Sequence, residues 1–274
     1  MKLAIHTLLA GPVDDAAIAN FLQAHTFPLV EGRQTTFIFQ GDVEAVRLRH
    51  WVFGLASSQA FHRVKNAAGQ NTNLWYHTLE LPPQSRVEYK LEIVEGDNVR
   101  WIQDPLNPNL AHDPFGANSV AHGTGYTVPE WIHADPEAKP GTLDDVRFDS
   151  QVFGRRGIAL YLPARFRRNR RYPLLVVHDG HDYLHYAALG TVLDNLIHRR
   201  EIPELIVALT SSPHRLGEYA ADPRHARFIT EELVPYVERT LPLDARPQSR
   251  CLMGASFGAV ASLTTALARP KFFG

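Results

Sequence analysis

The chain has 274 residues, of which 45% are hydrophobic and 21% are charged, so it can bury a core and is not disordered. Its net charge of −1 gives no electrostatic reason to expect a nucleic acid or an anionic membrane as a partner. The single cysteine, Cys251, excludes an internal disulfide and a cysteine-based metal site, and it suits the reducing cytoplasm.

The N-terminal residues predict a short helix. His6 and Thr7 interrupt the first apolar stretch, so we expect no export signal, and no later stretch reaches the length of a membrane span. Asp14 and Asp15 are typical of a helix N-terminus, and residues 16–25 place apolar side chains at helical spacing. We therefore expect residues 1–29 to form an N-terminal helical segment.

Residues 30–108 favour an all-β module. Segments rich in β-branched and aromatic residues alternate with turn signals, and they are Thr35–Gln40, Val43–Arg49, Leu74–Leu81, Arg86–Val94 and Asn98–Gln103. In Arg86–Val94 apolar and charged side chains alternate strictly, which predicts one buried and one solvated face. Short strands with regular turns predict a β-sandwich. Residues 109–140 carry many prolines and glycines and are expected to be a linker.

Residues 141–274 predict an α/β domain with a mostly parallel sheet, because strands and helices alternate. The expected strands are Val146–Phe153 and Gly157–Leu162, as an antiparallel pair, and the buried runs Tyr172–His178 and Leu205–Leu209. The expected helices are Asp182–Arg199 and Arg224–Arg239.

The last predicted unit is a strand, a sharp turn and a helix. Cys251–Met253 is a short apolar run, Gly254–Gly258 is a G-x-S-x-G pentapeptide, and the helix that follows is stopped by Pro270. This is the context of a nucleophile elbow, in which the serine stands at the carboxyl edge of the sheet. The alternative interpretation is an ordinary glycine-flanked helix N-cap.

With these motifs placed in order, the chain resembles the enterochelin (enterobactin) esterases, within the wider esterase D-like group of α/β-hydrolases. The motifs that carry the resemblance are Asp104–Pro108, His178–Gly180, His214–Tyr219, Phe228–Pro235 and Gly254–Gly258. The resemblance implies an immunoglobulin-like sandwich over residues 30–108 and an ester-hydrolysing domain over residues 141–274. It also implies a serine esterase that needs no cofactor or metal, acting in the cytoplasm on a small ester such as a catecholate siderophore trilactone.

The chain departs from this pattern after the serine. An α/β-hydrolase presents its acid and then its histidine after the nucleophile, yet residues 257–274 contain neither. The last histidine is His225, upstream of Ser256. We therefore expect the catalytic domain to be truncated, with the acid and histidine beyond Gly274. The strand over residues 250–253 should then lie at an open edge of the sheet beside an exposed apolar patch.

Six residues are predicted to form the site. Ser256 is the expected nucleophile, and the backbone N–H of Phe257 is one expected oxyanion donor. By resemblance the second donor is the N–H of His181, with Asp182 as the next choice. Arg215, Glu218 and Tyr219 are expected to bind substrate. For Arg215 the functional interpretation is recognition of an anionic catecholate, and the structural one is an ion pair with Glu218.

Other motifs favour structural roles. His178, His181 and His185 have ligand-like spacing, but we expect polar histidines at the mouth of a cleft rather than a metal site. The arginines of residues 165–171 are expected to form a solvated turn, and Trp51 is a candidate for stacking against a sugar or aromatic ligand.

Two other functions remain open at this point. One is a carboxylesterase that acts on acylated sugars or feruloyl esters. The other is a catalytically inactive module that uses the sandwich to hold a carbohydrate or a siderophore.

Overall fold

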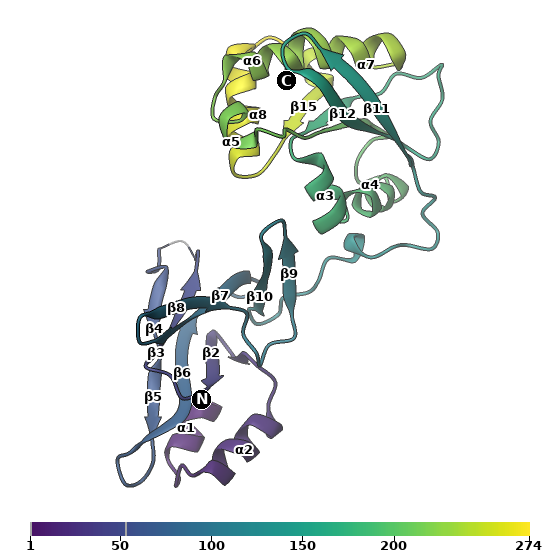
Figure 1. The fold of residues 1–274 in the computed structure, drawn as a ribbon. Coiled ribbons are helices and arrows are strands. Elements are labelled where there is room, and N and C mark those ends of the chain that lie inside the picture. Colours follow the sequence, from purple (N-terminus) through teal and green to yellow (C-terminus); the bar gives the residue numbers. More distant parts are fainter. Residues whose placement is uncertain (1, 53) are drawn as a thin grey trace. The chain divides into compact units, whose positions relative to one another are not determined.

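The protein, described here by a computed structural model that covers residues 2–52 and 54–274, divides into two compact units (Figure 1). The first unit spans Met1–Val128 and the second Pro129–Gly274. None of the helices in the described ranges is both long and apolar enough to cross a bilayer.

The N-terminal unit consists of two helices and two antiparallel sheets. Its helices are α1 (Ala4–Leu9) and α2 (Asp15–Ala24). One sheet has the order β1-β2-β6-β5, formed by Leu29–Glu31, Gln34–Gln40, Asn71–Glu80 and His62–Lys65. The other has the order β4-β3-β7-β10-β9, formed by Ser58–Ala60, Ala45–His50, Arg86–Glu95, Gly116–His122 and Leu110–Asp113, and β8 (Asn98–Ile102) also pairs with β7.

The two sheets of the N-terminal unit share one apolar core. Phe37 and Trp75 of the first sheet pack with Leu48, Tyr89 and Leu91 of the second in a single cluster of buried side chains. The strict alternation predicted in β7 is the reason, because it directs Val87, Tyr89 and Leu91 to the same face. The two helices cover part of the first sheet in a separate cluster.

The expected linker is partly ordered sheet. Residues 110–122 form β9 and β10, and β10 pairs with the central strand β7, so the linker expectation is wrong for this stretch. The prolines and glycines that suggested a linker lie around these strands and in the turn between them. The remaining stretch up to residue 141 contains only a 3-10 helix, η1 (Glu130–Ile132).

The C-terminal unit is a five-stranded sheet with the order β11-β12-β14-β13-β15. Its strands are Thr142–Ser150, Gly154–Leu162, Ile206–Thr210, Leu174–Val177 and Arg250–Met253. The two pairings of β13, with β14 and with β15, are parallel, whereas β12 pairs antiparallel with β11 and with β14. The sheet is therefore mixed rather than mostly parallel. β15 lies at one edge, as expected from the sequence.

Helices cover both faces of this sheet. They are α3 (Gly180–Tyr186), α4 (Leu189–His198), α5 (Arg215–Glu218), α6 (Pro223–Arg227), η2 (Phe228–Leu233), α7 (Val234–Thr240), η3 (Pro247–Ser249) and α8 (Phe257–Ala268). On one face Ile229, Leu233 and Val237 of η2 and α7 pack against the strands, and on the other face Leu189 and Leu193 of α4 do so. Because both faces are covered, β13 and β14 are almost wholly buried, as their continuous apolar sequences predict.

Two predicted helices are interrupted. The helix expected over residues 182–199 is two helices, because Ala188 takes a left-handed conformation between them. The helix expected over residues 224–239 is α6, the π-helix η2 and α7 in succession. Pro235 lies at the start of α7 and has no N–H to donate, which accounts for the wider turn before it.

Candidate functional site

The carboxyl ends of the three parallel strands meet at one edge of the sheet. β13 leads into His178–Gly180, β14 leads into the turn before Arg215, and β15 leads into Gly254–Ser256. Val177 is in register with Met253, and the N–H of His178 donates to the carbonyl of Met253 at 2.8 Å. The turns after β13 and β15 therefore leave the sheet side by side, and parallel α/β sheets bind their ligands at this edge.

Ser256 occupies a sharp turn between β15 and α8. Its φ of 53° and ψ of −123° are an outlier for a residue with a side chain, and the residue is exposed. A Cβ on Gly254 would lie 2.4 Å from backbone atoms of Gly258, so strand and helix approach too closely there for any residue but glycine. These are the features of a nucleophile elbow, in which backbone strain holds the hydroxyl out of the sheet.

Two helices begin beside this turn, and their first N–H groups are free. Phe257 is the first residue of α8, and among the described residues its N–H has no acceptor. His181 is the second residue of α3, and its N–H likewise has no described acceptor. Free N–H groups at helix N-termini attract negative charge. A Cβ on Gly258 would lie 3.1 Å from Asp179 Oδ2, so the first turn of α8 is in contact with the turn that precedes His181.

The structure places Arg215 at this edge, paired with a partner that sequence reasoning missed. Its Nε donates to both carboxylate oxygens of Asp179 at 2.9 Å. Its guanidinium carbon lies 5.7 Å from the ring centroid of Phe257 and 5.9 Å from that of Tyr219. Burial raises the pKa of Asp179, and the bonds from Arg215 oppose that rise in part.

Glu218 and Tyr219 are buried and face the interior rather than the open edge. Glu218 accepts from Arg156 at 2.7 Å, from Ser212 at 2.5 Å and from His225 at 3.0 Å, so the expected ion pair between Arg215 and Glu218 does not form. Burial acts to raise the pKa of Glu218, but these partners outweigh it and hold the pKa below its ordinary value. Tyr219 is 1% exposed, and burial raises its pKa to about 12. In this arrangement both residues support the site from behind.

The histidines near the turn do not converge on a metal. His178 is fully buried, whereas His181 and His185 are exposed on α3. Within the described ranges no group of three or more histidine, cysteine, aspartate or glutamate side chains is placed to hold an ion. The arginines of residues 165–171 lie in an exposed turn, and Trp51 is 67% exposed.

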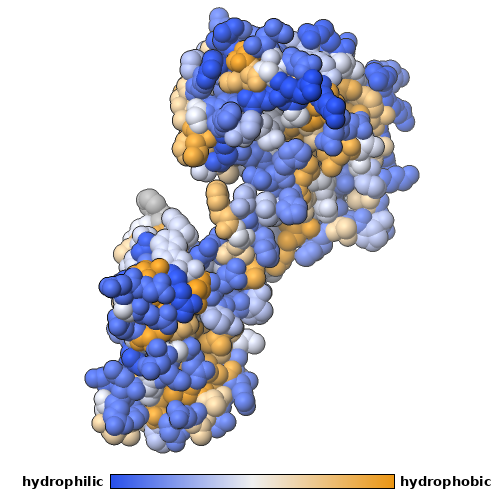
Figure 2. All heavy atoms as spheres, in the orientation of Figure 1, coloured by the Kyte–Doolittle hydropathy of each residue, from blue (hydrophilic) through white to orange (hydrophobic). Residues whose placement is uncertain are grey.

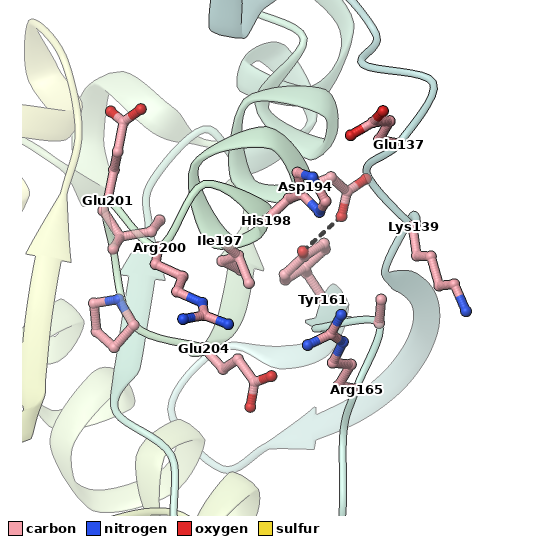
Figure 3. Close-up of a pocket in the computed structure, with 13 residues that line it drawn as sticks. Glu137, Lys139, Tyr161, Arg165, Asp194, Ile197, His198, Arg200, Glu201 and Glu204 are labelled. Atoms are coloured by element: carbon pink, nitrogen blue, oxygen red, sulfur yellow. Dashed lines mark hydrogen bonds between the residues drawn. The ribbon is translucent and has the colours of Figure 1, made fainter.

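A separate pocket of about 410 Å³ lies at the opposite edge of the sheet (Figure 3). Tyr161, near the end of the antiparallel strand β12, and Glu204, just before β14, both line it. The Tyr161 hydroxyl donates to Asp194 at 2.7 Å, and the long side chains of Arg165 and Arg200 border the space. Because parallel strands start at this edge, the pocket is distant from Ser256 and takes no part in the site described above.

Comparisons with known proteins agree with the geometry at the carboxyl edge. Residues 150–274 match the model of the family described as "Putative esterase". The chain is 31% identical over 144 residues to the uncharacterised protein YjcH of Bacillus subtilis, covering 50% of this chain and 60% of that protein. It is 24% identical over 229 residues to the iron(III) enterobactin esterase of Escherichia coli, covering 74% of this chain and 56% of that enzyme.

Solved structures show the same fold. An enterobactin esterase from Shigella flexneri superposes with a TM-score of 0.71 at 20% identity, covering 93% of this chain and 74% of that one. A ferric enterobactin esterase from Salmonella typhimurium gives a TM-score of 0.69 at 21% identity, covering 88% of this chain and 70% of that one. The predicted resemblance to enterochelin esterase-like proteins is therefore confirmed. The chain spans between half and two thirds of the length of the curated relatives it matches.

Proposed function

We propose that this chain supplies the nucleophile and the oxyanion hole of a serine carboxylic ester hydrolase. The observation that carries the proposal is the conformation of Ser256, an exposed serine held at φ 53° on the turn between β15 and α8. Its Oγ would attack the ester carbonyl carbon and form an acyl-enzyme with loss of the alcohol. The N–H groups of Phe257 and His181 would donate to the carbonyl oxygen as it becomes negative.

The proton that leaves Ser256 Oγ must pass to a general base. Among the described residues, no side chain forms a hydrogen bond with this hydroxyl. A serine hydroxyl without a base is a weak nucleophile at neutral pH. In the proposed reaction this chain therefore supplies the nucleophile and the oxyanion donors, and none of the described residues supplies the base.

The proposed substrate is a bulky anionic catechol ester, as in an iron-carrying or iron-free siderophore. One curated relative and several structural neighbours are named as enterobactin esterases, which motivates the substrate class. Arg215 supports it, because its Nε alone is engaged by Asp179 and its other guanidinium nitrogens have no partner among the described residues. A partly buried guanidinium with free N–H groups suits an anionic ligand at the mouth of the site.

We further infer that the β-rich part of the N-terminal unit is an immunoglobulin-like sandwich. Two antiparallel sheets around a common core support this inference. The proposed boundaries are a helical segment before residue 30, a sandwich that extends past residue 108 through β10 to residue 122, and the hydrolase domain from residue 141. Proteolysis and expression of the separate segments test these boundaries.

A non-catalytic module that binds the ester remains a second candidate. It is favoured because none of the described side chains is hydrogen-bonded to the Ser256 hydroxyl as a base. The two candidates differ in what happens at Ser256. We expect a serine-directed fluorophosphonate, used in excess over hours, to form a slow adduct confined to Ser256 and absent from Ser256→Ala. Ser57→Ala, which removes an exposed serine of the other unit, is the matched control and should be labelled like the parent chain. An adduct distributed over several serines would refute the nucleophile assignment and leave the binding module.

A further inference from the structure

A line of buried polar side chains runs beneath the turn that follows β13. His178 Nε2 lies 2.8 Å from His225 Nε2, and His225 Nδ1 lies 3.0 Å from Glu218 Oε1. At the other end Ser262 Oγ lies 2.9 Å from His178 Nδ1. The two imidazoles and the carboxylate are each at most 5% exposed, so these contacts form away from solvent.

These four residues belong to separate elements of the C-terminal unit. His178 follows the last residue of β13, Glu218 ends α5, His225 lies in α6, and Ser262 lies in α8. The line of hydrogen bonds therefore ties α5, α6 and α8 to the end of β13. None of the four is assigned a chemical step in the proposed hydrolysis, although two of them are titratable imidazoles close to the nucleophile turn.

The positions of the protons follow from the acceptors at the two ends. An ionised carboxylate accepts only, so His225 carries a proton on Nδ1 and donates it to Glu218. A backbone carbonyl also accepts only, and the carbonyl of Met253 lies 3.2 Å from His178 Nδ1, so His178 carries a proton on Nδ1. The Ser262 hydroxyl donates to the carbonyl of Gly258 at 2.9 Å, which leaves its oxygen to accept from the same Nδ1–H. A neutral His178 then accepts at Nε2 from the Nε2–H of His225.

Both carboxylate oxygens of Glu218 face a buried donor. Arg156 Nη2 lies 2.7 Å from Oε2, and His225 Nδ1 lies 3.0 Å from Oε1. The nearby ion pairs, Arg215 with Asp179 and Arg224 with Asp222, are each balanced. Burial and the neighbouring His225 lower the pKa of His178 to about 3, so His178 is neutral. Tyr219, which packs edge-on against both rings, adds no charge because burial raises its pKa.

The line of hydrogen bonds restrains the backbone that carries the proposed oxyanion donors. His178 is followed at once by Asp179, Gly180 and His181. A Cβ on Gly258, next to Phe257, would lie 3.3 Å from the Cβ of His178, so α8 begins in close contact with this turn. A rotation of the His178 ring would move the turn relative to α8, and with it the His181 N–H relative to the Phe257 N–H.

We propose that His178 and His225 are positioning residues, and that hydrogen bonds running from Ser262 through both imidazoles to Glu218 fix the separation of the two oxyanion donors. This inference rests on the proposed function of Ser256. It assigns no proton transfer to either histidine, and every bond in the line is kept while the ester reacts.

Heteronuclear NMR of the histidine-labelled 274-residue chain tests the direction of the line. We expect a neutral His178 with its proton on Nδ1, and a hydrogen bond in which the Nε2–H of His225 is donated to Nε2 of His178. A proton of His178 on Nε2, or the absence of a hydrogen bond between the two Nε2 atoms, would overturn the proposal. This readout does not depend on catalysis, and a merely space-filling role would not fix the tautomer of His178.

A pair of substitutions tests the positioning role at Ser256. His225→Gln keeps N–H groups that donate, whereas His225→Leu keeps none. The rate of the Ser256 phosphonate adduct should fall about tenfold or more in His225→Leu, since loss of a whole oxyanion donor costs on the order of a hundredfold. It should stay within about threefold of the parent rate in His225→Gln, because that variant retains the positioning bonds. His198→Gln, an exposed histidine of α4, is the control and should leave the rate unchanged.

The rate of adduct formation must be measured below the melting temperature of every variant. A folding defect is then not mistaken for a loss of positioning. Equal rates for His225→Leu and the parent chain, with the adduct still confined to Ser256, would overturn this inference alone. An adduct that forms equally in Ser256→Ala would overturn the proposed function and this inference together.

Discussion

Arg215 donates through Nε to both carboxylate oxygens of Asp179, at 2.9 Å each. This ion pair joins the turn after β13 to the start of α5. The guanidinium of Arg215 also lies beside the ring of Phe257. Arg215 is 30% exposed at its side chain, so it can hold the turn and still present free N–H groups to a ligand. The structural and the functional interpretations of Arg215 are therefore compatible.

Replacing Arg215 with alanine should weaken binding of an anionic catechol ligand such as dihydroxybenzoylserine. A charge-assisted hydrogen bond contributes about 1–3 kcal/mol, so we expect the Kd to rise roughly tenfold to a hundredfold in calorimetry. Arg224→Ala, which removes an exposed arginine paired with Asp222, is the control. If Arg215→Ala lowers the affinity for the anionic ligand and for its neutral methyl ester equally, the role of Arg215 is structural and not anion recognition.

The 274-residue chain should hydrolyse nitrophenyl esters barely above the uncatalysed rate. Ser256 has no imidazole partner in the described ranges, and without a base its hydroxyl is largely unactivated. The measurement is the initial rate of nitrophenolate release, compared with Ser256→Ala. Rapid, stoichiometric labelling of Ser256 by a fluorophosphonate would contradict this prediction, because it would show that a residue of this chain serves as the base.

Acidification should destabilise the C-terminal unit through His178. The unfolded chain binds a proton near the ordinary value of 6.5, whereas the folded chain does not until its pKa of about 3. The unfolded state therefore binds more protons as the pH falls below 6.5, and stability decreases by up to about 1.4 kcal/mol per pH unit. Chemical denaturation at several pH values measures this slope.

His178→Gln should flatten the slope, because the amide does not titrate. The other groups with lowered pKa values, such as His50 and His77 of the N-terminal unit, are the same in both proteins, so they cancel in the comparison. Identical slopes for the parent chain and His178→Gln would contradict the expected shift of the His178 pKa.

Gly254, in the turn before Ser256, should not tolerate a methyl group. In Gly254→Ala the new Cβ would lie 2.4 Å from backbone atoms of Gly258, so strand and helix must separate. We expect a loss of about 1–3 kcal/mol or more in the free energy of unfolding, as for overpacked cores. In Gly190→Ala, on α4, the Cβ meets nothing within 4 Å, and we expect no loss or a gain of up to about 1 kcal/mol. Equal melting temperatures for the two variants would contradict the close approach.

The edge strand β15 and the helix α8 should cause association at high concentration. β15 pairs on one side with β13 and has no described partner on the other. Leu263 and Leu267 of α8 are 61% and 70% exposed, and Figure 2 shows apolar surface on the side of the C-terminal unit where Figure 1 draws α8. Unpaired edges beside apolar surface recruit other chains.

We expect light scattering to show concentration-dependent association that decreases in Leu263→Lys. Leu143→Lys places the same charge on β11, at the opposite edge of the sheet, and should leave association unchanged. A monodisperse monomer at high concentration would contradict the prediction, and so would a stronger effect of Leu143→Lys.

The sequence by itself determined the local elements. The buried runs that became β13 and β14, the alternation in β7 and the elbow around Ser256 each depend on residues within a few positions of one another. The spacing of apolar residues, the positions of glycines and continuous apolar runs indicate such local requirements directly. Dependence on local residues also explains why the linker prediction was wrong at residues 110–122. A short strand whose partner lies elsewhere in the chain has no strong sequence pattern of its own.

Only the tertiary structure decided which polar residues meet. Asp179 and Arg215 are 36 positions apart, His178 and His225 are 47, and Arg156 and Glu218 are 62. Sequence spacing placed Arg215 and Glu218 within reach of each other, yet each found a more distant partner. The physical reason is that buried charges must be paired by whichever opposite group the packing brings close, and packing joins strand ends that the linear order keeps apart.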